Sequence, residues 1–166
     1  EMAFALSATA PRDSHSQARF LSLGERTNAV LFAACLNASG IRAEVAWPCG
    51  FGLRTQGPAL GAEVDFEATG DIRKHFRAEK VYVVPGFYGC NAEGQTQLLG
   101  RGGSDYSAAA LAHVLGAQNL DLWKDVNGFC TANPQWVPHA HTISELSYEE
   151  ASELAYFGSG IIHPRT

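Results

Sequence analysis

Residues 99–107 read LGRGGSDYS and run directly into the small-residue segment AAALA over residues 108–112. Glycine lets backbone N–H groups approach an anion closely, and a helix N-terminus adds partial positive charge and free N–H donors. Arg101 can hold a carboxylate or a phosphate through two parallel hydrogen bonds. The pattern predicts an anion-binding turn at the start of a helix, although a glycine-rich loop entering an ordinary helix has the same composition.

Strands and helices are expected to alternate around this turn. Ser22 and Glu25 have the S-x-x-E spacing of a capping box, which predicts a helix that ends at residues 39–40. Residues 41–47 alternate enough to form a strand, and the β-branched run at residues 80–85 predicts a buried parallel strand. This alternation indicates a parallel α/β sandwich.

Weaker patterns cover other parts of the chain. Residues 1–19 are weakly patterned, and we expect them to be irregular. A stretch rich in glycine and proline predicts a loop at residues 48–61, and residues 71–78 could form a short helix. We expect residues 91–94 to form the turn of a small hairpin reaching over the site, and residues 120–123 to form a short strand.

Two further helices have clear boundaries in the sequence. We expect Ser104 to cap a helix that carries apolar residues at helical spacing and stops at Gly116. Ser147 and Glu150 form a second capping box, which predicts the start of the last full helix.

Composition narrows the class of protein. The 166 residues suit one domain or part of one, and a hydrophobic content of 46% is enough for a core. A net charge of −5 argues against a nucleic-acid-binding surface. Because Lys74, Lys80 and Lys124 are the only lysines, an ATP site would have to use helix N-termini, arginine and Mg²⁺.

The cysteines and the apolar runs indicate in which compartment of the cell the protein acts. The four cysteines form no C-x-x-C pair, so we expect reduced, mostly buried cytosolic thiols. Since no apolar run approaches the length that spans a membrane, we expect a cytoplasmic protein that does not contact membranes. These cysteines are Cys35, Cys49, Cys90 and Cys130.

Further motifs accompany the glycine-rich turn in a fixed order: SLGE at 22–25, GFYG at 86–89, LWKDVNG at 122–128, ELAYFG at 153–158 and HPRT at 163–166. Together they resemble the aspartate kinases of the amino acid kinase family, over residues 20–166. The resemblance implies a three-layer αβα sandwich with a mainly parallel sheet, like that of carbamate kinase. Residues 1–19 would be a separate, poorly patterned segment.

The resemblance also implies an activity. Aspartate kinases transfer the γ-phosphoryl group of MgATP to the side-chain carboxylate of L-aspartate, which opens lysine, threonine and methionine biosynthesis. The family's N-terminal Lys-Phe-Gly-Gly motif and its C-terminal ACT domains have no counterpart here, so we expect a partial catalytic domain, incomplete at its N-terminus. The alternative is a non-catalytic module that binds aspartate or regulates. The motifs argue against a kinase of glutamate or of a nucleotide.

On the substrate side, the resemblance implies roles for residues of two motifs. Arg101 matches the arginine that holds the α-carboxylate, and Glu25 the glutamate that meets the α-amino group, although Glu25 could instead only close its capping box. Asp105 matches an aspartate near the phosphoryl path, although a first-turn acid also stabilises a helix by roughly 0.3–1 kcal/mol. The remaining substrate contacts would come from Ser104 and from the backbone N–H groups of Gly102 and Gly103.

On the nucleotide side, the resemblance is weaker. Asp125 matches an aspartate that contacts the nucleotide, and Lys124 stands where the family has threonine, so Lys124 could contact a phosphate or point to solvent. Cys130 takes a place often held by tyrosine or an aliphatic residue, Gln135 replaces an arginine, and Gly160 replaces a lysine. These departures favour weakened ATP binding.

Two expectations concern metals and partners. His139 and His141 lie in a polar loop without nearby ligands, so we assign no residue to a metal other than the Mg²⁺ that accompanies ATP. A parallel sheet without its first strand would leave backbone edges unpaired. We therefore expect a homo-oligomer or a companion segment.

Overall fold

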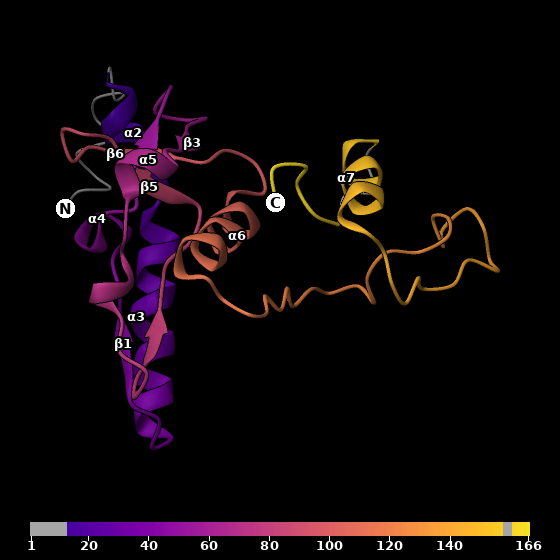
Figure 1. The fold of residues 1–166 in the computed structure, drawn as a ribbon, viewed down its shortest axis with the longest axis horizontal. Coiled ribbons are helices and arrows are strands. Elements are labelled where there is room, and N and C mark those ends of the chain that lie inside the picture. Colours follow the sequence, from indigo (N-terminus) through magenta and orange to yellow (C-terminus); the bar gives the residue numbers. More distant parts are fainter. Residues whose placement is uncertain (1–12, 158–160) are drawn as a thin grey trace.

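The computed structural model describes residues 13–157 and 161–166 (Figure 1). Its helices and strands occur in the following order: α2 (Ser14–Leu21), α3 (Leu23–Ala38), β1 (Ala43–Val45), α4 (Pro48–Phe51), β2 (Thr55–Gln56), β3 (Glu63–Val64), α5 (Phe66–Thr69), the 3₁₀ helix η1 (Arg73–His75), β4 (Val81–Val83), β5 (Tyr88–Cys90), β6 (Thr96–Leu98), α6 (Gly103–Leu115) and α7 (Tyr148–Tyr156). None of the described helices is long and apolar enough to cross a membrane.

Helix α2 corrects the expectation for residues 14–19. The carboxylate of Asp13 accepts hydrogen bonds from the backbone N–H groups of His15 and Ser16, which caps the helix. Ala18 is fully buried and packs with Tyr88 and Leu98. The segment is therefore ordered by a local cap and by tertiary packing, which a short polar sequence does not reveal. Residues 1–12 lie outside the described residues, and the domain boundary at residue 20 stays a prediction.

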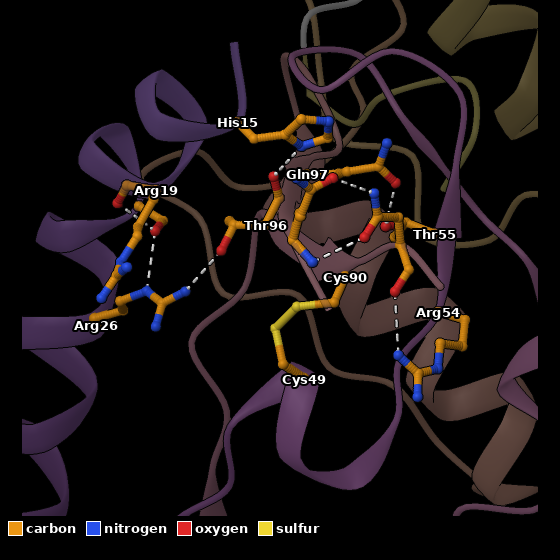
Figure 2. The surroundings of a disulfide bond; sticks show 12 residues. His15, Arg19, Arg26, Cys49, Arg54, Thr55, Cys90, Thr96 and Gln97 are labelled. Atoms are coloured by element: carbon orange, nitrogen blue, oxygen red, sulfur yellow. Dashed lines mark hydrogen bonds between the residues drawn. A yellow bond between two sulfur atoms is a disulfide. The ribbon is translucent and has the colours of Figure 1, made fainter. Parts of the chain in front are cut away.

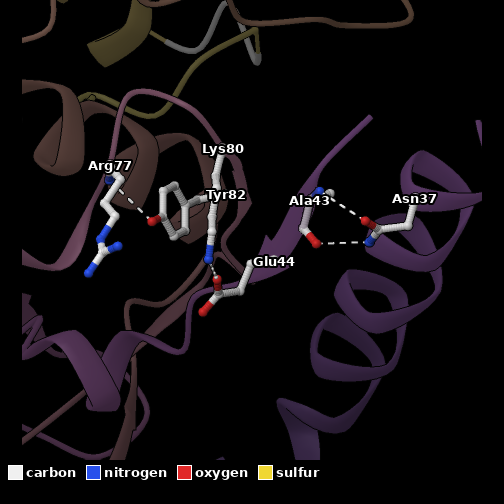
Figure 3. Close-up of polar contacts among 6 residues, drawn as sticks. All are labelled: Asn37, Ala43, Glu44, Arg77, Lys80 and Tyr82. Atoms are coloured by element: carbon white, nitrogen blue, oxygen red, sulfur yellow. Dashed lines mark hydrogen bonds and ion pairs between the residues drawn. The ribbon is translucent and has the colours of Figure 1, made fainter. Parts of the chain in front are cut away.

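The expected parallel strands are confirmed as β1 and β4, which pair in register from Ala43 with Val81 to Val45 with Val83. Helix α3 packs along both strands. The side chain of Asn37 donates to the carbonyl of Ala43 at 2.8 Å and accepts from its N–H group at 3.2 Å, which ties the end of α3 to β1 (Figure 3). The pair is less buried than expected, since Val81 is 44% exposed.

Two antiparallel pairs complete the strands. β5 and β6 form the expected hairpin, with its turn at residues 91–95. The expected loop at residues 48–61 contains α4 and β2 instead, and β2 pairs with β3. The short helix expected at residues 71–78 is reduced to η1.

The strand expected at residues 120–123 is wrong. Residues 117–147, all within the described part of the chain, form neither a helix nor a strand apart from an isolated bridge between Cys130 and Thr142. Trp123 is 93% exposed, so neither a pairing partner nor a packed face stabilises an extended backbone there. In Figure 1 this segment and α7 extend to one side of the other elements. The capping box that opens α7 at Ser147 and Glu150 is confirmed.

The main core joins α6 to segments that precede β4 and to Leu99, which follows β6. Its buried residues are Phe51, Leu53, Val64, Ile72, Leu99, Tyr106 and Ala110. The hydroxyl of Tyr106 accepts a hydrogen bond from the N–H group of Val64 at 3.1 Å, which fixes α6 against β3. This core sets the position of the first turn of α6.

A disulfide between Cys49 and Cys90 corrects the expectation of four reduced thiols (Figure 2). It joins α4 to the end of β5, with the two Cα atoms 5.4 Å apart. Cys35 and Cys130 are free, but Cys35 is exposed and Cys130 only partly buried, so the expected burial is also wrong for them. Spacing along the chain could not show the pairing because the fold alone brings these residues together.

A second, smaller core is formed by Ala18, Tyr88 and Leu98, and its stability can be tested at Tyr88. It is fully buried beneath the guanidinium of Arg26, 4.4 Å from the ring centre, and its hydroxyl has no hydrogen-bond partner among the described residues. Burial raises the pKa of Tyr88 to about 12. We expect Tyr88→Phe to leave the free energy of unfolding unchanged or to raise it by up to about 1 kcal/mol, because it removes an unsatisfied buried hydroxyl. Urea unfolding measures this, and a clear loss of stability would contradict it.

Candidate functional site

The glycine-rich turn leads into α6 in a way that corrects the expected cap. Gly102, not Ser104, is the N-cap residue, with a φ of 69° in the left-handed region that favours glycine. Ser104 is therefore the second residue of the helix. Its N–H group and that of Gly103 belong to the first turn, where backbone donors lack helical partners. Backbone donors are thus available at this turn, and the anion binding expected of it stays a prediction.

The capping box expected at Ser22 is also wrong. Ser22 has helical dihedral angles of −77° and −6°, because the chain passes through it from α2 into α3. Its buried hydroxyl donates to the carbonyl of Arg19 at 2.8 Å and accepts from Nε of Arg26 at 2.9 Å. Glu25 thus lies in the first turn of α3 without closing a capping box.

A cavity of about 350 Å³ brings the substrate-side residues together. It is lined by Glu25, Phe87, Gly100, Arg101, Gly102, Gly103, Ser104, Asp105 and Lys124. The lining therefore holds two carboxylates, two cations and the first turn of α6. These side chains suit a small ligand that carries both a positively and a negatively charged group.

An ion pair lies within this cavity. Nζ of Lys124 is 2.5 Å from Oδ2 of Asp105, and the two side chains are 26% and 19% exposed. Asp105 is the third residue of α6, where the helix dipole favours a carboxylate. The segment that follows α6 thus returns to its first turn through Lys124.

The residues expected on the nucleotide side do not line this cavity, except for Lys124. Asp125 and Gln135 are exposed, and Cys130 is partly buried beside its bridge to Thr142. Gly160 lies outside the described residues. The described ranges contain no group of three or more His, Cys, Asp or Glu side chains that could hold a metal.

Phe87 and Gly100 also line the cavity, although no pattern in the sequence predicted a role for either residue. Phe87 has a φ of 76°, which is rare for a residue with a side chain. Its backbone is held by two hydrogen bonds, one from its N–H group to the Ser107 hydroxyl at 3.2 Å and one to its carbonyl from Leu99 at 2.8 Å. The flanking glycines of the GFYG motif were the available signal for this unusual backbone.

The HPRT segment lies against the glycine-rich turn, whereas the β5–β6 hairpin turn lines a different cavity. A Cβ on Gly102 would come within 2.6 Å of Cβ of His163, so the HPRT segment packs directly on the turn. The hairpin turn expected over the site instead borders a second cavity of about 540 Å³, to which Asn91 and Glu93 contribute. That part of the expectation is wrong, because no residue of the hairpin turn lines the cavity at the start of α6.

Comparisons with known proteins identify relatives of this chain. A model of the amino acid kinase family matches residues 3–166. The chain is 40% identical over 145 residues to the bifunctional aspartokinase/homoserine dehydrogenase of Haemophilus influenzae, covering 86% of this chain and 18% of that protein. It is 38% identical over 148 residues to an aspartokinase of a Bacillus species, covering 87% of this chain and 35% of that protein.

A crystal structure of Escherichia coli aspartokinase III in complex with aspartate and ADP matches with a TM-score of 0.90 and 32% identity. The match covers 99% of this chain and 38% of that chain, so this chain spans little more than a third of that relative. The expected fold class, an α/β sandwich of the amino acid kinase type represented by part of a domain, is confirmed.

Proposed function

This chain belongs to the amino acid kinase family, and we propose that it supplies the substrate-binding part of an aspartate kinase. The reaction would be transfer of the γ-phosphoryl group of MgATP to the side-chain carboxylate of L-aspartate, which gives 4-phospho-L-aspartate and ADP. The observation that best supports this proposal is the cavity that Glu25 and Arg101 line together with the first turn of α6. The structural relative was solved with aspartate and ADP, which supports the same ligands here.

The cavity assigns each charged group of aspartate a partner. The carboxylate of Glu25 would accept hydrogen bonds from the α-ammonium group, and the guanidinium of Arg101 would hold the α-carboxylate. Gly102, Gly103 and Ser104 would add donors from the first turn of α6. The side-chain carboxylate of the bound aspartate would then face Asp105 and Lys124.

Phosphoryl transfer needs positioning and charge neutralisation more than covalent chemistry by the protein. We assign catalytic roles to Arg101, Ser104 and Asp105, and nucleotide contacts to Lys124, Asp125, Cys130, Gln135 and Gly160. Mg²⁺ usually keeps several waters and is held by substrate phosphates with one or two carboxylates. Asp105 fits that requirement, and the metal would neutralise charge on the phosphates.

A second candidate function follows from the nucleotide side. Asp125, Cys130 and Gln135 do not reach the cavity, and Gln135 carries no charge to meet a phosphate. A chain with this arrangement could bind aspartate without transferring phosphate. For either function we propose a cytoplasmic protein that pairs with a further copy or a companion segment. As a kinase, it would open the pathway to lysine, threonine and methionine.

Isothermal titration with L-aspartate, and separately with the Mg²⁺ complex of a non-hydrolysable ATP analogue, tests the proposal. We expect aspartate to bind one site with a Kd below about 1 mM, the usual upper range for enzyme substrates. Binding of both ligands, followed by ADP release in a coupled assay, would support the kinase. Binding of aspartate alone would favour the non-catalytic module, and binding of neither would contradict both.

A further inference from the structure

The GFYG segment lies directly against the first turn of α6. A Cβ on Gly86 would come within 2.9 Å of the Ser107 hydroxyl oxygen and within 3.1 Å of Cα of Ser104. A Cβ on Gly103 would come within 3.1 Å of Cδ2 of Phe87. The two segments thus meet with no room for further side chains. A shift of one against the other would change the cavity that Phe87, Gly103 and Ser104 line.

Ser107 joins the two segments through its hydroxyl group. The hydroxyl donates to the carbonyl of Ser104 at 2.8 Å and accepts from the N–H group of Phe87 at 3.2 Å. Since a hydroxyl has a single proton, the bond to Ser104 leaves only its lone pairs to meet Phe87, and the N–H group there is the matching donor. Because Ser107 is only 2% exposed, bulk water does not compete for either bond.

Phe87 needs such an anchor because its backbone angle is unfavourable. A φ of 76° crowds the side chain of any residue other than glycine, so the surrounding structure must hold Phe87 in place. The N–H group of Leu99 holds its carbonyl at 2.8 Å. Ser107 holds its N–H group, and Ser107 belongs to the same helix as Gly103 and Ser104. The hydroxyl therefore fixes Phe87 relative to the first turn of α6.

We infer that Ser107 is a positioning residue for the ligand of this cavity and that it acts through the backbone of Phe87. Ser107 is not among the residues that line the cavity, whereas Phe87 is. Without the hydroxyl, the GFYG segment would spend part of its time in conformations that do not fit the ligand. The apparent affinity would fall by the fraction of the fitting conformation. This inference rests on the proposed function, because L-aspartate is the ligand with which the cavity is tested.

The test is Ser107→Ala, which removes one oxygen atom and keeps a residue with high helix propensity. Isothermal titration with L-aspartate should give a Kd about tenfold higher than that of the unmodified chain. Amide hydrogen exchange followed by NMR should be faster at Phe87 and unchanged in the middle of α6. Ser107→Thr keeps a hydroxyl that can bond to the carbonyl three residues earlier in a helix, so its Kd should stay within about twofold of the original.

Thr69→Val is the matched control. The hydroxyl of Thr69 donates to the carbonyl of Asp65 at 2.6 Å and accepts from the N–H group of Arg54 at 3.0 Å. Thr69 is 7% exposed and does not line the cavity. Its hydroxyl thus makes the same two kinds of hydrogen bond as that of Ser107, from a helix to a neighbouring segment. Its loss should lower the free energy of unfolding and leave the Kd for aspartate unchanged.

Three results would overturn the inference while the proposed function stands. The first is an unchanged Kd in Ser107→Ala, and the second is an equal rise of the Kd in Thr69→Val. The third is a raised Kd in Ser107→Ala without faster exchange at Phe87, because the effect would then not pass through that residue. If the unmodified chain binds no aspartate, the proposed function fails and the inference fails with it.

Discussion

Reduction of the Cys49–Cys90 disulfide will lower the free energy of unfolding by about 4 kcal/mol, if the bond acts mainly by limiting the unfolded chain. The bond links residues separated by 41 positions, and the loss of loop entropy grows with that separation. The contact between α4 and β5 should survive, because the N–H group of Cys90 also donates to the carbonyl of Leu53 at 3.1 Å. Reduction should therefore change stability more than fold.

Urea unfolding with and without a thiol reductant measures this change. The double variant Cys49→Ser/Cys90→Ser should match the reduced protein and no longer respond to the reductant. Cys35→Ser/Cys130→Ser is the control, because it removes the two free thiols and should keep the full response. Equal midpoints for the oxidised and reduced forms of the unmodified chain would contradict the prediction.

This result bears on the proposed cytoplasmic location. Thiol buffers keep most cytosolic cysteines reduced. If the protein acts there, its working stability is that of the reduced chain, and the core that surrounds Leu53 and Tyr106 must suffice without the covalent bond. The reduced form is then the one in which the ligand titrations should also be made.

Local signals in the sequence predicted that helices lie near the site, but they did not predict how the first turns of α3 and α6 begin. Gly116 ends α6 as expected because a left-handed cap is a local requirement. The hydroxyl of Ser22 instead meets Arg26 and the carbonyl of Arg19, since α2 continues into α3. The S-x-x-E spacing at Ser147 was a capping box, so the same spacing had two outcomes. The difference lies in the helix that precedes Ser22.

The candidate site could also be predicted only in part from the sequence. The glycine-rich turn and Glu25 could be paired from the family resemblance, and the structure brings them to one cavity. The flanking glycines of the GFYG motif signal an unusual backbone, but they do not show that Phe87 itself takes the positive φ. That angle depends on hydrogen bonds from the Phe87 N–H group to Ser107 and from Leu99 to the Phe87 carbonyl. The position of Lys124 depends on how the irregular segment after α6 returns to Asp105, which no local pattern encodes.

Glu25→Gln will weaken aspartate binding by roughly 10- to 150-fold, the effect of losing about 1.5–3 kcal/mol from a charge-assisted hydrogen bond. The change keeps the shape and one acceptor of the side chain but removes the charge that faces the α-ammonium group. Because Glu25 closes no capping box, the change should lower the stability of α3 by no more than about 0.3–1 kcal/mol, the effect of losing an acidic charge from the first turn. Isothermal titration and urea unfolding measure the two effects separately.

Measuring ligand affinity and stability separately distinguishes a ligand-binding role of Glu25 from a purely structural one. A purely structural glutamate would lose stability in Glu25→Gln and retain its ligand affinity, whereas a ligand contact would show the reverse. Succinate, which has both carboxylates of aspartate but no ammonium group, sharpens the test. Its affinity should be the same or higher in Glu25→Gln, because the variant removes a negative charge that repels this ligand. If succinate and aspartate lose affinity equally, the carboxylate of Glu25 does not bind the ammonium group, and the arrangement of aspartate between Glu25 and Arg101 is wrong.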